Sequence, residues 1–142
     1  MPLPAGRLLS TDAELRAALA GIRTIAVLGM KGPDRGGPAW TVPRYLHQQG
    51  FRVIPVGPAC SEAFGIAGKP DLDALGEPVD LLNVFRRSDA LMGHLPEILR
   101  LRPRLVWLQL GIRSENFASA LAEAGIDLVE DRCLFVEHAR LF

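Results

Sequence analysis

The chain has 142 residues, of which 49% are apolar and 23% charged, a composition typical of one globular domain with its own core. Its 16 basic and 16 acidic residues balance, which argues against a basic surface for nucleic acid. No apolar stretch is long enough to cross a membrane, and the N-terminus lacks the apolar segment of a signal peptide. The two cysteines, Cys60 and Cys133, are too few for a disulfide framework. We expect one cytoplasmic domain over residues 1–142, with no nucleic acid and no membrane as partner.

Helix and strand signals alternate in the first half of the chain. Thr11 and Glu14 form a capping-box pattern at the start of an amphipathic run. Thr41 is a plausible N-cap, with Pro43 tolerated in the first turn of its helix. We expect helices near 11–21 and 41–49, strands over 24–28 and 51–56, and a loop rich in glycine and proline over 29–39.

The alternation continues in the second half. Ser88 and Ser114 are candidate helix N-caps, while Pro103 and Gly125 mark helix ends. We expect an irregular segment over 59–70, a helical turn over 71–75, strands over 79–85, 104–110 and 126–129, helices over 88–101 and 114–124, and a last helix over 133–142.

Strands that alternate with helices of about ten residues indicate βαβ units and a parallel sheet. The predicted strands are continuous apolar runs, which is typical of a sheet covered on both faces. The sequence therefore predicts an α/β fold of Rossmann type: a single doubly wound, mostly parallel, five-stranded sheet with helices on both faces.

The segments that follow the predicted strands are rich in basic residues. In an open parallel sheet ligands bind beside the carboxyl ends of the strands, so these segments predict a site for an anion. The alternative is that individual side chains are solvated or paired with nearby acids. The basic residues at this edge are Lys31, Arg35, Arg86, Arg87, Arg113 and Arg132.

The first and second strand ends narrow the choice of ligand. Gly29 opens a loop whose backbone N–H groups can approach a phosphate, although neither the dinucleotide fingerprint nor a P-loop is present. The second predicted strand ends at Val56 and is followed by Gly57 and Pro58, where an NAD site usually carries an acid for the ribose hydroxyls. The missing acid argues against NAD and is compatible with the 3′-phosphate of coenzyme A (CoA).

Five segments stand out, in chain order: Ile25–Gly29, Val53–Pro58, Val79–Arg87, Val106–Gly111, and Asp131–Cys133 with Glu137 and His138. Together, and in this order, they resemble the small standalone CoA-binding domain family. The resemblance covers roughly residues 15–142, and the fold of that family is similar to the CoA-binding domain of the succinyl-CoA synthetase alpha subunit. Three positions depart from the family's pattern. This chain has Ala39 where the family usually has serine, and Trp40 where it usually has tyrosine, histidine or asparagine. It has Gly57 where the family usually has asparagine.

The resemblance implies CoA or an acyl-CoA as the cofactor and assigns roles to segments. The loop from Gly29 to Trp40 would hold the pyrophosphate, Val56–Pro58 would border the adenosine, Phe85–Arg87 would meet the phosphates, and Gln109–Gly111 would line the pantetheine side. The implied site residues are Gly29, Met30, Lys31, Arg35, Pro38, Ala39, Trp40, Val56, Gly57, Pro58, Phe85, Arg86, Arg87, Gln109 and Gly111. Trp40 would either stack on the ligand or pack in the core.

No other chemistry is evident from the sequence. His47, His94 and His138 show no metal-ligand spacing, and no hydrolase motif is present. Cys60 and Cys133 follow strand ends, where a thiol can exchange with that of CoA, or they are small buried residues. We expect a carrier, sensor or regulatory module that is not itself an enzyme and that has a possible protein partner. The alternatives are an NAD(P)-binding, oxidoreductase-like domain and an interaction domain without a ligand.

Overall fold

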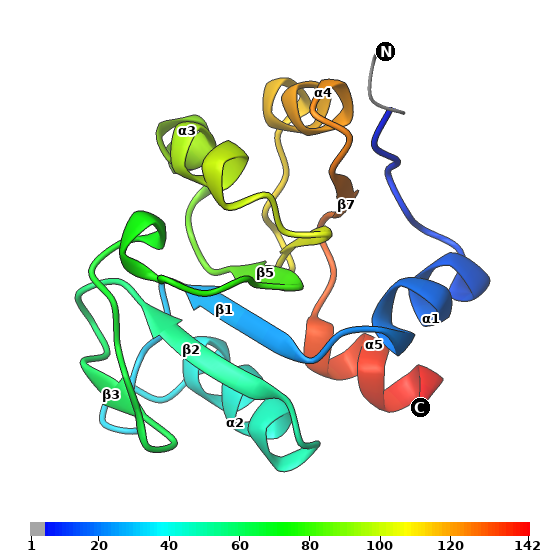
Figure 1. Ribbon diagram of the computed structural model, residues 1–142. Coiled ribbons are helices and arrows are strands. Elements are labelled where there is room, and N and C mark those ends of the chain that lie inside the picture. The colour runs from blue at the N-terminus through cyan, green and yellow to red at the C-terminus, as the bar shows by residue number, and fades with distance from the viewer. Residues whose placement is uncertain (1–4) are drawn as a thin grey trace.

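The central feature of the structure, a computed structural model that describes residues 5–142, is one parallel sheet. Its five strands lie in the order β2-β1-β5-β6-β7 (Figure 1). They are β1 (Thr24–Leu28), β2 (Arg52–Val56), β5 (Leu81–Val84), β6 (Leu105–Leu108) and β7 (Asp127–Val129). Leu28 pairs with both Val56 and Val84, and Val84 pairs with Leu108, so these strands end at one common edge.

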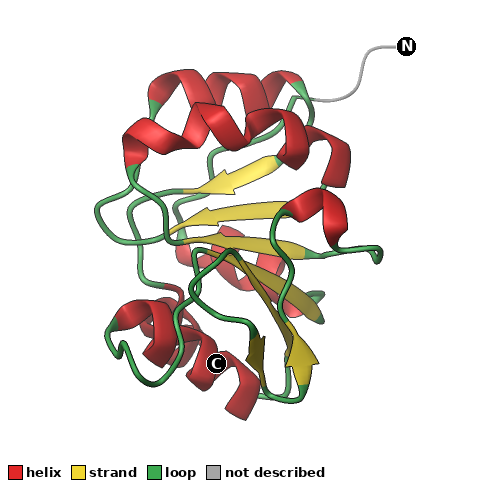
Figure 2. Ribbon diagram, turned by 90° about the vertical axis from the view of Figure 1, so that its left-hand side faces the viewer, coloured by secondary structure: helices red, strands yellow, loops and turns green. Residues whose placement is uncertain are grey.

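Helices cover both faces of the sheet, as Figure 2 shows. One layer contains α1 (Asp12–Ala20), α2 (Pro38–Gln48) and α5 (Leu134–Leu141), and the other contains α3 (Leu91–Leu101) and α4 (Glu115–Glu123). Ile25 and Val27 pack toward the first layer, and Ala26 and Leu28 pack toward the second. This alternation divides the core into two clusters.

The predicted Rossmann-like fold is confirmed, and the sheet is parallel throughout. The predicted capping box also forms: Glu14 N–H donates to Thr11 Oγ1 at 3.2 Å, and Thr11 N–H donates to Glu14 Oε1 at 3.0 Å. Ser114 caps α4 by accepting from the N–H of Phe117 at 3.3 Å. No helix among residues 5–142 combines the length and the apolar character that crossing a bilayer requires.

Two predicted helix starts are wrong. Helix α2 begins at Pro38 and not after Thr41, because Gly37 adopts a φ of +74° at the N-cap and Pro38 has a φ suited to the first helical position. Ser88 does not cap α3. It begins the 3₁₀ turn η2 (Ser88–Ala90), and its hydroxyl accepts from the N–H of Arg113 at 3.1 Å.

The segment 59–70, predicted to be irregular, contains a small hairpin of β3 (Glu62–Ala63) and β4 (Ile66–Ala67). It is followed by the predicted helical turn, the 3₁₀ helix η1 (Leu72–Ala74). The hairpin turn is Phe64-Gly65, with φ values of +56° and +77°. Phe64 stacks on Trp40 and His47 of α2, with centroid distances of 5.5 and 4.3 Å. These contacts hold a turn conformation that phenylalanine seldom adopts.

Candidate functional site

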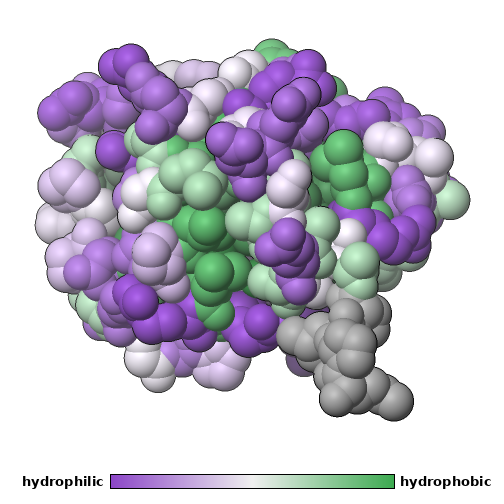
Figure 3. All heavy atoms as spheres, turned by 90° about the horizontal axis from the view of Figure 1, so that it is seen from above, coloured by the Kyte–Doolittle hydropathy of each residue, from purple (hydrophilic) through white to green (hydrophobic). Residues whose placement is uncertain are grey.

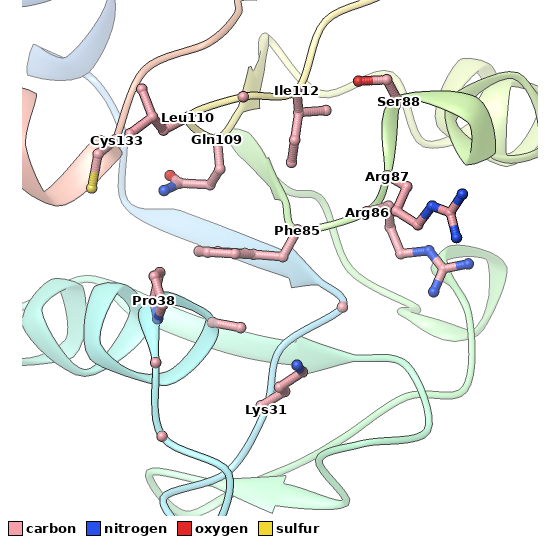
Figure 4. Close-up of a pocket in the computed structure, with 15 residues that line it drawn as sticks. Lys31, Pro38, Phe85, Arg86, Arg87, Ser88, Gln109, Leu110, Ile112 and Cys133 are labelled. Carbon is pink, nitrogen blue, oxygen red and sulfur yellow. The ribbon is translucent and has the colours of Figure 1, made fainter.

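A cleft of about 640 Å³ opens at the carboxyl edge of the sheet, between the ends of β1, β5 and β6 (Figure 4). The chain leaves β1 toward α2 on one face and leaves β5 toward α3 on the other. These connections diverge between two adjacent strands, which is where doubly wound sheets form a binding crevice. The cleft is lined by Gly29, Lys31, Gly36, Gly37, Pro38, Ala39, Phe85, Arg86, Arg87, Ser88, Gln109, Leu110, Gly111, Ile112 and Cys133.

Gly29 lets the first loop pass close to the end of β5. Its φ is +85°, and a Cβ there would lie 2.5 Å from the carbonyl oxygen of Phe85. Its N–H donates to Val56 O at 2.9 Å. The loop then reaches α2, whose N-terminus has no side-chain cap and contributes Pro38 and Ala39 to the cleft. A helix N-terminus at a cleft favours an anion.

The structure brings three of the six predicted basic residues to the cleft: Lys31, Arg86 and Arg87. Arg87 forms an exposed ion pair with Asp89 at 2.8 Å. Lys31 and Arg86 form no ion pair within residues 5–142. The side chains of Arg86 and Arg87 lie together at one end in Figure 4. This end of the cleft is therefore suited to phosphate.

The other three basic residues do not line the cleft. Arg113 faces Glu130 at 3.6 Å and Asp131 at 4.0 Å. Arg132 donates to Glu137 and to the carbonyl oxygen of Ser10. Arg35 is exposed in the loop before α2. These three side chains are therefore paired with acids or solvated, which is the alternative that the sequence left open.

A second cavity of about 220 Å³ lies beside the first, and Gly29 and Arg86 line both. Gly57 and Pro58, the residues expected to border the adenosine, line it. It also holds Asp71 and Glu97, although the sequence analysis found no acid at the end of β2. Asp71 directly precedes η1 and Glu97 lies in α3, so no motif near the strand could have indicated them.

Both acids are engaged by neighbouring groups. Asp71 accepts from the N–H of Ala74 at 3.0 Å. Glu97 accepts from the N–H of Leu72 at 3.2 Å and lies 2.7 Å from Nδ1 of His94. Their carboxylates thus satisfy local donors and fix η1 against α3.

The opposite end of the cleft is largely apolar, with Phe85, Leu110 and Ile112 on its walls. Gln109 is the polar exception there. It is only 4% exposed, and its Oε1 accepts from Asn83 Nδ2 and from the N–H of Leu134, each at 3.0 Å. The two donors fix which side of the amide carries the oxygen.

Four predicted site residues lie outside both cavities. Met30 and Val56 are in the core, with exposures of 0% and 1%, where their apolar side chains are more stable. Trp40 packs on Phe64, as the core interpretation of this residue predicted. Arg35 points to solvent. Gly36, Gly37 and Leu110 also line the cleft; they lie within segments to which the resemblance assigned a role but were not named as site residues. The sequence analysis missed Ser88 and Ile112, although both follow a predicted strand.

The histidines lie apart from the main cleft. His47 stacks on Phe64, and His94 lines the smaller cavity. His138 is buried, and the hydroxyl of Tyr45 lies 2.7 Å from its Nδ1. Burial lowers the pKa of His138. Within residues 5–142 no group of three or more His, Cys, Asp and Glu side chains is arranged to hold a metal ion.

Comparisons with known proteins agree with this geometry. A family model described as a CoA binding domain matches residues 23–139. The Bacillus subtilis protein YneT is 34% identical over 130 residues, or 91% of this chain and 95% of YneT. A solved Thermus thermophilus structure is 56% identical with a TM-score of 0.88, over 94% of this chain and all of the other. Apo acetyl-coenzyme A synthetase 1 from Ca. Korarchaeum cryptofilum is similar in fold, with a TM-score of 0.62 and 19% identity over 74% of this chain and 25% of its own.

Proposed function

This chain belongs to the CoA-binding domain family, and we propose that its cleft and the adjoining smaller cavity together hold one molecule of CoA or acyl-CoA. The observation that carries the proposal is the division of the cleft into a basic end and an apolar end. CoA has the same division, because its phosphates lie on the nucleotide half and its pantetheine arm is uncharged.

The nucleotide half occupies the basic end. Arg86 lines both cavities and therefore lies between the adenosine and the pyrophosphate. The adenosine lies in the smaller cavity against Gly57 and Pro58. The pyrophosphate lies between Gly29 and the N-terminus of α2, where the backbone approaches closely and the helix end is positive. The pantetheine arm passes Phe85 toward Gln109.

A comparison of ligands by thermal unfolding tests this assignment. CoA at about a hundred times its dissociation constant should add roughly 2.7 kcal/mol to the free energy of unfolding, a shift of roughly 5–10 °C for a domain of this size. Dephospho-CoA, which lacks the 3′-phosphate, and NAD should give smaller shifts. A clear shift with NAD or NADP and none with any CoA species would contradict the proposal and favour the oxidoreductase-like alternative.

The domain acts as a carrier, sensor or regulatory module in a reducing cytoplasm and does not turn over its ligand. Both cysteines are free thiols, and His138 is bonded to Tyr45 and lies outside the cleft. A thioester bound there has no histidine beside it to act as a base. Acetyl-CoA or succinyl-CoA incubated with the protein should therefore stay intact, with or without a nucleoside triphosphate. Steady turnover that is lost in His138→Ala would contradict this part of the proposal.

A further inference from the structure

Cys133 lies on the wall of the main cleft and is partly exposed. Figure 4 shows it on the far side of the cleft from Arg86 and Arg87, with Phe85 between them. If the nucleotide half of CoA lies at the end of the cleft that carries Arg86 and Arg87, as proposed above, the pantetheine arm ends on the side of Cys133. The sulfur of CoA is the last atom of that arm, so two sulfur atoms meet at this end.

A second side chain marks the same place as a ligand site. Gln109 is 4% exposed and its Oε1 accepts two hydrogen bonds, so its Nε2 is held on the other side of the amide. Nε2 has no hydrogen-bond partner within the part of the chain that the structure describes, and the amide lies in the cleft near Cys133 in Figure 4. Nε2 is not itself fully buried, so it can donate a hydrogen bond to a ligand in the cleft. The carbonyl oxygens of the pantetheine amides are acceptors of the kind that it lacks.

The side chain of Cys133 is also free to react with a molecule in the cleft. It is the N-cap of the eight-residue helix α5, and its side chain makes no capping hydrogen bond. Cys60 differs in every respect: it is 5% exposed, lies outside the cleft, and donates to the carbonyl oxygen of Glu62 at 3.4 Å. Burial raises the pKa of the Cys60 thiol.

We propose that Cys133 captures CoA covalently as a mixed disulfide, by exchange with the disulfide form of CoA. The thiolate of Cys133 attacks one sulfur of the CoA disulfide, and the bond between the two CoA sulfurs breaks. A bond forms between Cys133 Sγ and one CoA, and the other CoA leaves as a thiolate that takes up the proton released by Cys133. The Cys133 sulfur is oxidised and the leaving CoA sulfur is reduced, so no further oxidant is needed.

The experiment compares two disulfides by intact-protein mass spectrometry without reductant. The full chain is mixed with CoA disulfide or, separately, with glutathione disulfide at the same concentration. We expect a single CoA adduct that forms about tenfold faster or more than the glutathione adduct, because the cleft raises the local concentration of the CoA disulfide at Cys133. The adduct should be absent in Cys133→Ser and unchanged in Cys60→Ser, the matched control. Equal rates with both disulfides, or an adduct on Cys60, would overturn the proposal.

Calorimetry with reduced CoA on the same protein separates this inference from the proposed function on which it rests. If reduced CoA binds and no adduct forms, the thiol of CoA does not reach Cys133; the inference fails and the CoA site stands. If reduced CoA does not bind, the CoA site is wrong and the inference fails with it. Binding of reduced CoA together with a Cys133 adduct supports both.

Discussion

The backbone N–H of Lys31 donates a hydrogen bond to the carbonyl oxygen of Ala39, with 3.1 Å between nitrogen and oxygen. In a regular helix this carbonyl would accept from residue 43, but Pro43 has no N–H. The sequence analysis placed Pro43 in the first turn of a helix. Because α2 begins at Pro38, Pro43 lies in the helix interior instead. Pro43 leaves the carbonyl oxygen of Ala39 without a helical donor. Because this oxygen accepts from Lys31 instead, it ties the start of the cleft loop to the start of α2.

We predict that Pro43→Ala loosens this loop. The new N–H at position 43 competes with Lys31 for the carbonyl of Ala39, so amide hydrogen exchange at Lys31 should accelerate by about tenfold or more. Because Pro43 is buried, the substitution also removes packing, which affects every amide that exchanges by global unfolding. The amide of Gly29, bonded to Val56 at 2.9 Å, is the control and should change only by that global amount. Equal acceleration at Lys31 and Gly29 would show that the Lys31 bond is not selectively weakened.

We predict that Gly29→Ala destabilises the fold far more than Gly50→Ala. Both glycines have positive φ, +85° and +95°, so each substitution carries the backbone cost of about 1–2 kcal/mol. At Gly29 the added Cβ would also lie 2.5 Å from Phe85 O, while at Gly50 it meets nothing within 4 Å. The expected loss for Gly29→Ala is at least about 3 kcal/mol. Urea denaturation measures the free energy of unfolding of both variants. Equal losses of stability would mean that the backbone at Gly29 and Phe85 moves apart at no cost.

The cations at the cleft should differ in their effect on CoA affinity. Arg86→Met should weaken binding about tenfold, equivalent to about 1.4 kcal/mol. Arg87→Met should weaken it less, because Arg87 already pairs with Asp89. Arg113→Met is the matched control: Arg113 is exposed, follows the next strand along the sheet and lies outside both cavities. Titration calorimetry measures the affinity of all three variants for CoA. If Arg113→Met loses as much affinity as Arg86→Met, the arginines act through long-range electrostatic attraction and not through contacts in a site.

The alternation of the chain is enough to predict the sheet, its two helical layers and the edge that carries the cleft. Pairing of individual cations is not predictable in this way. Arg86 and Arg113 both follow strand ends, yet only Arg113 lies beside acids. Both of these acids, Glu130 and Asp131, follow a different strand, β7. Which partner a side chain meets depends on how the strands order in the sheet, which local patterns do not specify.

The hairpin of β3 and β4 shows a second limit. Its turn, Phe64-Gly65, lacks the Asn-Gly or Asp-Gly signal that marks such turns. Tertiary contacts replace that signal, because Phe64 stacks on Trp40 and His47, which precede it by 24 and 17 residues. The acids of the smaller cavity were missed for the same reason, since Asp71 and Glu97 reach it from outside the strand ends.

The environment of His138 implies a pH dependence of stability. Its ring stacks on Phe142 at a centroid distance of 4.9 Å and meets the edges of Tyr45 and Phe51. Burial holds its pKa below the ordinary value of 6.5. In the unfolded chain the imidazole regains that ordinary value. Between the two pKa values the unfolded state therefore binds more protons than the folded state, and the free energy of unfolding falls as the pH falls.

We predict that this loss begins near pH 6.5, as the unfolded-state histidine titrates, and levels off below the folded-state pKa of His138. Within this window the loss is at most about 1.4 kcal/mol per pH unit, the limit for a single group. Urea denaturation at pH 7.5 and 5.5, on the wild type and His138→Gln, measures it. Glutamine does not titrate, so the variant should lose less stability over this interval, although it is less stable at pH 7.5 because the contact with Tyr45 changes. His47 and His94 are present in both proteins, so their contributions cancel in the difference. An identical loss in both proteins would show that His138 has the same proton affinity in the folded and unfolded states.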